Sequence, residues 1–249
     1  LPYSRSALTS SSRQLLVERP VIVGWSTGLL RYFSPHLIVY GKLAQGQFAY
    51  NFALTDGLQA GDSDRTFSRR EVTASRNPGL VGRLEYSPPG WLEGRKSDSH
   101  LGRGRHLSFG LNGVFQSGIE LEGLGKERRF LLGADLSFHR ESVSLGAEYI
   151  YINRDAAAEV EPSGWYVQGG YYIKGLDIEP AVRFDAADKD ANLDDVGTKT
   201  FSGGFNWYVS GHDLKFQVNV FHRVFDRGAR EVSGKGSKTG LQIQNQMYF

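Results

Sequence analysis

The sequence predicts an all-β protein, a transmembrane antiparallel β-barrel of about 12 strands. Stretches of about ten residues alternate apolar with polar side chains, which is the period of a strand and the length that crosses a bilayer at a tilt. A composition with 31 Gly, 12 Tyr and 15 Phe is typical of strands and turns. No stretch approaches the roughly 18–20 consecutive apolar residues of a membrane-spanning helix.

The order of elements follows from this alternation. Residues 1–20 lack a sustained period and predict an opening loop that could fold into the pore, while 21–249 predict the barrel. The alternation is blurred in the first two predicted strands, and the polar stretch 56–78 predicts a long connection. The predicted strands are 21–30, 36–43, 47–55, 80–87, 107–116, 129–139, 142–152, 164–174, 176–185, 200–209, 214–223 and 241–249.

The connections between these strands alternate in length. Short ones lie at 140–141, 175 and 210–213, whereas long ones lie at 117–128, 154–162, 186–198 and 226–238. Short turns at one end and long loops at the other are typical of outer-membrane barrels, with the short turns in the periplasm. The connection 88–105 is an exception, because it is long and falls on the short side.

The two faces of the strands differ in chemistry. The apolar parity carries aromatic residues near segment ends, such as Phe138, Trp165 and Trp207, and is predicted to face lipid. The polar parity carries many full charges and is predicted to face a wet lumen. Alternation alone also fits a soluble sandwich, in which the apolar parity would form the core, so that alternative stays open.

Composition also argues against several classes of function. A net charge of +2 gives no reason to expect a nucleic-acid partner, and the absence of Cys excludes disulfides and thiolate metal sites. The His residues show no paired metal-ligand spacing. We therefore expect no metal, no cofactor and no enzymatic activity.

The opening of the chain resembles a known family. Its motifs are Leu1-Pro2-Tyr3-Ser4-Arg5-Ser6-Ala7-Leu8-Thr9-Ser10-Ser11, Leu16-Val17-Glu18-Arg19, Val81-Gly82-Arg83-Leu84, Gly203-Gly204-Phe205-Asn206-Trp207-Tyr208 and the aromatic C-terminus. The chain is similar in these motifs to the phosphate-selective porin O and P family. Members of that family are sixteen-stranded, typically trimeric barrels that pass anions, and in them the opening motif lies well inside the chain. The resemblance thus implies either the C-terminal 12 strands of a 16-stranded barrel or a shortened relative.

The resemblance also implies a function and a location. We expect an outer-membrane porin that allows passive diffusion of small, anionic, phosphate-like solutes. The implied partners are the lipid bilayer, lipopolysaccharide and two further copies in a homotrimer. The final Phe249 resembles the signal that barrel-assembly machinery reads. The alternative is a structural or scaffold barrel that anchors partner proteins and conducts little.

Basic residues on the polar parity are the candidate anion contacts, because an anion-selective pore needs cations at its constriction. Acids on the same parity nearly balance them. The basic residues are Lys42, Arg83, Arg129, Lys174, Arg183, Lys215 and Arg223, and the acids are Glu85, Asp135, Glu148, Asp177, Glu179 and Asp185. Two loops add further arginines. If a loop folds into the lumen, its arginines set the selectivity; if it lies outside, they are surface groups. The first loop carries Arg5, Arg13 and Arg19, and the second carries Arg65, Arg69, Arg70 and Arg76.

Overall fold

A computed structural model describes residues 3–30, 34–64, 70–155, 161–190, 193, 195–229 and 234–247. Its strands form one antiparallel sheet in the order β1-β2-β5-β6-β7-β8-β9-β10-β11-β12-β13, with β4 beside β6 and β3 beside β4. The strands are β1 (His36–Leu43), β2 (Phe48–Thr55), β3 (Ser63–Asp64), β4 (Arg70–Ser75), β5 (Gly79–Tyr86), β6 (Arg105–Leu121), β7 (Gly125–Arg140), β8 (Val143–Asp155), β9 (Ser163–Tyr171), β10 (Ile178–Asp188), β11 (Gly197–Ser210), β12 (Leu214–Phe225) and β13 (Ser237–Met247).

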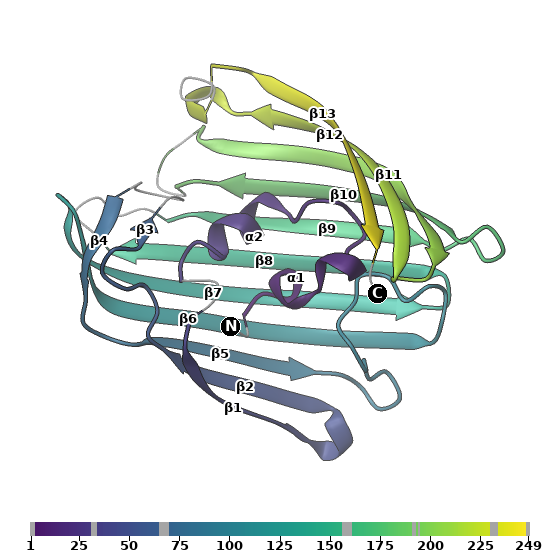
Figure 1. Ribbon diagram of the computed structural model, residues 1–249, viewed down its shortest axis with the longest axis horizontal. Helices are drawn as coiled ribbons and strands as arrows, with labels where there is room; N and C mark the ends of the chain where they lie inside the picture. Colours follow the sequence, from purple (N-terminus) through teal and green to yellow (C-terminus); the bar gives the residue numbers. More distant parts are fainter. Residues whose placement is uncertain are drawn as a thin grey trace.

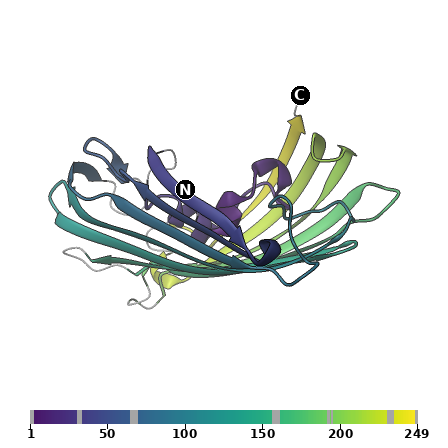
Figure 2. The ribbon, with the colours of Figure 1, turned by 90° about the horizontal axis from the view of Figure 1, so that it is seen from below.

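The sheet is curved into a trough whose concave side holds the start of the chain (Figures 1 and 2). Within the described residues, β1 and β13 form the two edges. The helices are α1 (Arg5–Leu8), α2 (Val21–Ser26) and the 3-10 turns η1 (Ser11–Arg13) and η2 (Ala44–Gly46). None of the helices in the described part of the chain is long and apolar enough to cross a membrane.

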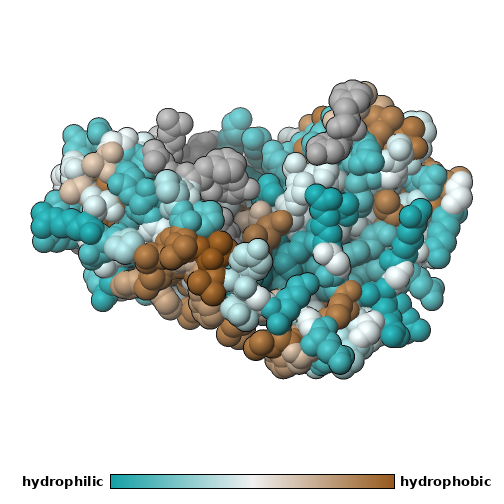
Figure 3. Space-filling view, turned by 60° about the horizontal axis from the view of Figure 1, so that its bottom comes forward, coloured by the Kyte–Doolittle hydropathy of each residue, from teal (hydrophilic) through white to brown (hydrophobic). Residues whose placement is uncertain are grey.

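The convex face of the sheet is apolar and exposed, and the concave face is mainly polar and buried. Leu111 on β6 is 63% exposed and Ile243 on β13 is 71% exposed, whereas Asn112, beside Leu111 on the other parity, is buried. Figure 3 shows hydrophobic residues gathered near the middle of the molecule and hydrophilic residues toward both ends. The predicted orientation of the two parities is confirmed, because a soluble sandwich would bury the apolar one.

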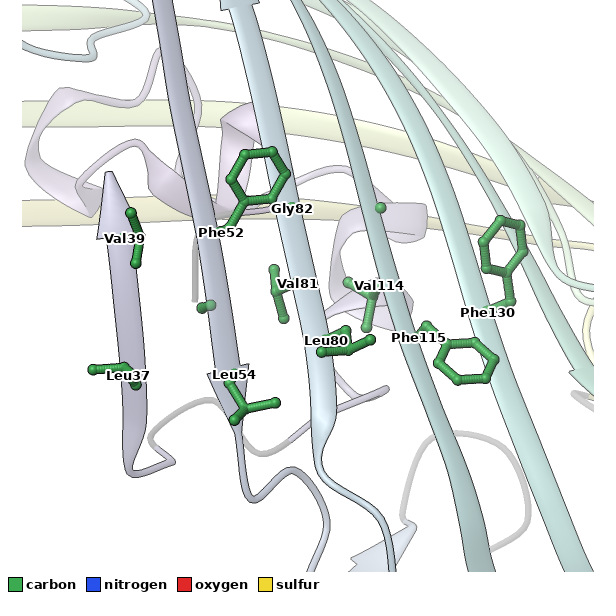
Figure 4. Close-up of a pocket in the computed structure, with 12 residues that line it drawn as sticks. Leu37, Val39, Phe52, Leu54, Leu80, Val81, Gly82, Val114, Phe115 and Phe130 are labelled. Atoms are coloured by element: carbon green, nitrogen blue, oxygen red, sulfur yellow. The ribbon is translucent and has the colours of Figure 1, made fainter. Parts of the chain in front are cut away.

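The convex face contains a hollow of about 490 Å³ across the first strands of the sheet. Gly82 and Gly113 leave room at its base, since neither carries a side chain. The side chains around it come from β1, β2, β5, β6 and β7 (Figure 4): Leu37, Val39, Phe52, Leu54, Leu80, Phe115 and Phe130. The hollow is part of the apolar outer surface and lies away from the polar lumen side.

The strand predicted over 21–30 is wrong, because this segment forms α2 and the turn that follows it. Its buried residues include Ile22, Val23, Leu29 and Leu30, which follow a helical rather than an alternating spacing. They pack on apolar side chains that the sheet points inward, namely Val81, Val114, Leu131, Ile150 and Ile152. Burial of this apolar patch selects the helix over the strand that the Val and Ile content favours.

Two predicted connections contain strands. The loop expected over 117–128 is wrong, because β6 continues to Leu121 and β7 begins at Gly125. The connection expected over 56–78 contains β3 and β4. Beyond the lipid-facing belt, Ile119 and Leu121 bury against Leu58 and Val72, and this small apolar cluster holds the hairpin extension to β4.

The two ends of the sheet differ in their connections. At one end lie the tight connections β1–β2, β7–β8, β9–β10 and β11–β12, and we call it the short-turn end. The connection between β5 and β6 also falls at this end although it spans 87–104. The opposite end, where β8–β9, β10–β11 and β12–β13 are joined, is the long-loop end.

Candidate pore-lining site

The opening segment, residues 3–30, is bound to the concave face by the strands near the middle of the sheet. The backbone N–H groups of Arg5 and Ser6 donate to the carboxyl group of Glu148 on β8 at 3.1 and 3.3 Å. The Tyr166 hydroxyl on β9 donates to the same group at 3.2 Å. Since two of these donors open α1, Glu148 fixes the place of this helix against the wall.

The rest of the opening segment is held further along the sheet. Lys215 Nζ on β12 donates to the carbonyl oxygen of Gln14 at 2.9 Å, and Asn206 Nδ2 on β11 donates to that of Leu15 at 3.0 Å. Leu15 also packs with Ala181 of β10. The segment therefore follows the lumen side from β8 toward β12.

A second segment, residues 88–104, turns back from the short-turn end onto the first, and we call it the returning segment. Arg5 forms a two-pronged ion pair with Glu93, with Nη1–Oε2 at 3.0 Å and Nη2–Oε1 at 2.8 Å. The Asp98 N–H donates to the Arg13 carbonyl oxygen at 3.0 Å. His212, in the turn after β11, lies 3.2 Å from Ser12 O and 3.1 Å from Ser99 O. These contacts join both segments to each other and to the wall.

Replacing Glu148 with Gln should loosen the start of the opening segment. Both carboxyl oxygens of Glu148 accept hydrogen bonds. The amide of Gln would turn its NH₂ group toward at least one of these donors, which should destabilise the docked segment by about 1–3 kcal/mol. Hydrogen exchange at the amides of Arg5 and Ser6 should accelerate. Tyr166→Phe is the matched control, because it removes one donor and leaves both amides bonded. Unchanged exchange in E148Q would contradict this role.

Three of the predicted anion contacts on the strands are neutralised by neighbouring acids. Arg83 binds Asp135 at 2.6 Å, Arg129 binds Glu127, and Arg183 lies 3.3 Å from Asp185. All three arginines are buried. They lie on the concave side of the sheet in ion pairs, and Arg129 shares Glu127 with Arg154, whose Nη2 lies 2.6 Å from Glu127 Oε2.

Other predicted contacts bind the folded backbone or lie apart. Arg5 is paired with Glu93, Arg19 donates to Ser6 O and Thr9 O at 3.0 and 2.9 Å, and Lys215 holds Gln14. Arg223 donates to Thr200 Oγ1 at 3.0 Å near the long-loop end. Lys42 and Lys174 are exposed, on the edge strand β1 and in the β9–β10 turn.

The second arginine-bearing loop is described only in part. Arg65 and Arg69 lie outside the described residues, as does Phe249. Arg70 is exposed on β4, and Arg76 is 67% exposed and paired with Glu120 at 3.1 Å. Neither described arginine of this loop is placed with the opening segment.

Arg13 lies in a pocket of the opening segment, and the structure places Arg95 with it. Both line a polar pocket of about 390 Å³ at the short-turn end, together with Ser10, Ser11, Ser12, His212, Asp213, Gln244 and Gln246. Partial burial and the positive charge of Arg95 lower the pKa of Arg13 from its usual value. Among the described residues, neither arginine forms an ion pair with a carboxylate.

Arg95 was missed from the sequence because it lies in a connection rather than on a strand. The signal that could have found it is the unexpected length of 88–105 at the end where turns are short. The connection folds back into the trough, where it contacts the opening segment.

Comparison with known proteins agrees with this geometry. The sequence model described as "Phosphate-selective porin O and P" matches residues 1–249. The chain belongs to this family. An uncharacterized protein of Aquifex aeolicus (strain VF5) is 33% identical over 265 residues, which cover 100% of this chain and 62% of that protein.

A solved structure shares the porin fold. The anion-selective porin from Comamonas acidovorans superposes with a TM-score of 0.57 at 13% identity, over 86% of this chain and 55% of that one. The chain thus spans less than two thirds of the length of either protein. The predicted family and the predicted antiparallel all-β porin fold are confirmed, and the sheet, which has edges at β1 and β13, is consistent with a barrel.

Proposed function

We propose that this member of the porin O and P family serves as an outer-membrane porin through which small, anionic, phosphate-like solutes diffuse passively. The observation that carries the proposal is the pocket that contains Arg13 and Arg95 without a paired acid. Guanidinium groups present paired donors that match phosphate-like oxygens, and serine hydroxyls add further donors. The similar porin from Comamonas acidovorans is described as anion-selective, which supports the same class of solute.

The other arginines on the concave face differ from Arg13 and Arg95, because they are paired with acids. Arg83, Arg129 and Arg183 are each paired with an acid of the wall, and Arg129 and Arg183 also donate to carbonyl oxygens of the opening segment, so their charge is consumed locally. A cation whose charge is not consumed keeps a long-range field, and a low-dielectric wall strengthens it. Arg13 and Arg95 therefore determine selectivity at the short-turn end.

Planar-bilayer recording across a KCl gradient tests the proposal. The wild-type protein should reverse at a potential that indicates a preference for chloride, and R13Q/R95Q should reduce the anion-to-cation permeability ratio severalfold. Arg76→Gln removes the same charge from an exposed pair at the long-loop end and should leave the ratio unchanged. An unchanged ratio in the double variant would remove these residues from the selectivity mechanism.

A scaffold barrel that conducts little is the second candidate. It is favoured by the opening and returning segments, which cover much of the concave face with ion pairs and hydrogen bonds. Electrically silent wild-type protein, correctly folded in the bilayer, would support this alternative and overturn the porin. Within the described residues, no group of three or more acids and histidines able to hold a metal occurs.

The proposed setting is the bacterial outer membrane, with the short turns in the periplasm. Assembly as a homotrimer, contact with lipopolysaccharide and delivery by barrel-assembly machinery through Phe249 belong to the same proposal. Family membership supports the membrane setting and an oligomeric porin. Crosslinking of the intact protein in its membrane tests the trimer.

A further inference from the structure

A pair of arginines lies on the outer, lipid-facing side of the sheet at the short-turn end. Arg105 begins β6 and Arg140 ends β7, and the two are directly opposite each other in the antiparallel register. Both side chains are exposed. They share the outward parity of Leu107 and Phe138, which lie two positions further along the two strands and are also directly opposite each other.

This pair is electrostatically unfavourable as it stands. Like charges at directly opposed positions of an antiparallel pair destabilise the sheet. Arg105 donates from Nε to the Gly90 carbonyl oxygen at 2.8 Å, which leaves its charge uncompensated. In the described part of the chain, neither arginine is paired with a carboxylate. An anion bound between the two guanidinium groups would relieve this repulsion.

An aromatic group completes the arrangement. The Trp91 ring lies 5.3 Å from the Arg105 guanidinium carbon and 5.9 Å from the Phe138 ring. Tryptophan at the boundary of an apolar belt marks the level of lipid headgroups. Below this boundary the outward residues are apolar and exposed, including Phe109, Leu111, Val143 and Leu145. A ligand here would have an anionic head at the arginines and a hydrocarbon tail along the belt.

We propose that Arg105, Arg140 and Trp91 bind the headgroup of an anionic phospholipid in the membrane leaflet at the short-turn end. The phosphate accepts hydrogen bonds from both guanidinium groups and relieves their repulsion. The acyl chains lie against the exposed belt of β6, β7 and β8. The site is distinct from the lumen pocket, because its side chains leave the opposite face of the sheet.

Lipid retention on the intact protein tests this inference. In native mass spectrometry, phosphatidylglycerol should be retained more strongly than phosphatidylcholine. R140Q should weaken that retention about fivefold and R105Q/R140Q by more than tenfold, since each surface cation contributes to anionic-lipid binding. The matched control is R128Q. Arg128 faces outward at the other end of β7 and is paired with Asp155, so its loss should not change retention.

Four results would overturn the site. One is equal retention of both lipids by the wild type, and another is an unchanged preference in the double variant. The third is dissociation of an oligomer by R105Q/R140Q with lipid retention intact, which would assign the pair to contact with a second copy. Inorganic phosphate alone should bind far more weakly than the lipid; equal binding would mean a free-anion site. Arg140 has no ion-pair partner in the described structure, so R140Q keeps the test valid if R105Q disturbs folding.

Discussion

Replacing Asp135 with Asn is expected to destabilise the barrel by about 3–5 kcal/mol, because it leaves the buried guanidinium of Arg83 without its main partner. The side chains of Arg83 and Asp135 are 1% and 0% exposed, and their two hydrogen bonds are 2.6 and 2.9 Å long. Glu85 also lies 2.9 Å from Arg83 but is shared with Lys96. One shared carboxylate cannot replace a dedicated pair.

The geometry of this pair depends on Gly110. Arg83 on β5 and Asp135 on β7 meet across the intervening strand β6, where Gly110 is directly opposite both Glu85 and Asp135. A Cβ at Gly110 would lie 2.4 Å from Arg83 Nη2 and 2.5 Å from Asp135 Oδ1. Because Gly110 has no side chain, the space above it is free for the ion pair between Arg83 and Asp135.

Urea unfolding from lipid vesicles, followed by tryptophan fluorescence, would measure the loss in D135N. Asp155→Asn is the matched control. It breaks the pair with Arg128, but both side chains are more than half exposed, so the loss should stay below about 1 kcal/mol. The double variant R83M/D135L should recover most of the stability, because it removes both buried charges. Equal losses in D135N and D155N would refute a structural role for the buried pair.

Replacing Glu93 with Gln is expected to release the returning segment and to increase conductance. Glu93 is the acid between Arg5 and Lys96, and it also lies 3.3 Å from His100 and 3.7 Å from His106. Losing a partner from a buried charge pair costs about 3–5 kcal/mol, which raises the population of the released segment by more than about 100-fold. Hydrogen exchange at Ser97 and Asp98 should accelerate accordingly.

Single-channel recordings of E93Q should show larger and noisier steps than those of the wild type. Glu141→Gln removes an exposed acid at the same end of the barrel and serves as the control. Unchanged exchange and unchanged conductance in E93Q would show that the returning segment is held by other contacts, such as the bond between Asp98 and Arg13.

The pH dependence of this contact follows from the pKa of Glu93. Burial opposes ionisation, but contact with His100 and the charge of Arg5 outweigh it and hold the pKa well below its usual range. A carboxyl group with a lowered folded-state pKa stabilises the fold above its unfolded pKa of about 4.3. The stabilisation is lost as pH falls from there through the folded-state pKa, so neutral and mildly acidic media should leave the segment docked.

Period-two alternation was sufficient to predict most of the wall. Phe109 and Leu111 on one parity and Asn112 on the other are where the pattern predicts them, because lipid and water select opposite chemistry on neighbouring residues. The pattern failed where a third environment exists. Ile119 and Leu121 continue β6 beyond the lipid belt, and Ile22 and Val23 bury inside the trough, so neither set is described by two faces alone.

The candidate site was predictable in parts. The alternation places Arg83, Arg129 and Arg183 on the inner face, where the structure has them. Which acid pairs with each arginine depends on the strand register, and the partners can be far apart in sequence, as Arg83 and Asp135 are. Arg13 was found from its place in the opening loop, whereas Arg95 depended on the path of a connection that has no period. Spatial proximity of these two arginines is set by tertiary contacts that no local pattern encodes.

The anchorage of the opening segment also orders events during folding. Arg5 and Glu148 are 143 positions apart, and Gln14 and Lys215 are 201 apart, so the first residues of the chain bind strands that are synthesised much later. Closing loops of this length is slow, and the partners of α1 do not exist until β8 and β9 have paired. The opening segment can therefore dock only after the strands that hold it have paired, which makes its docking a late step of folding.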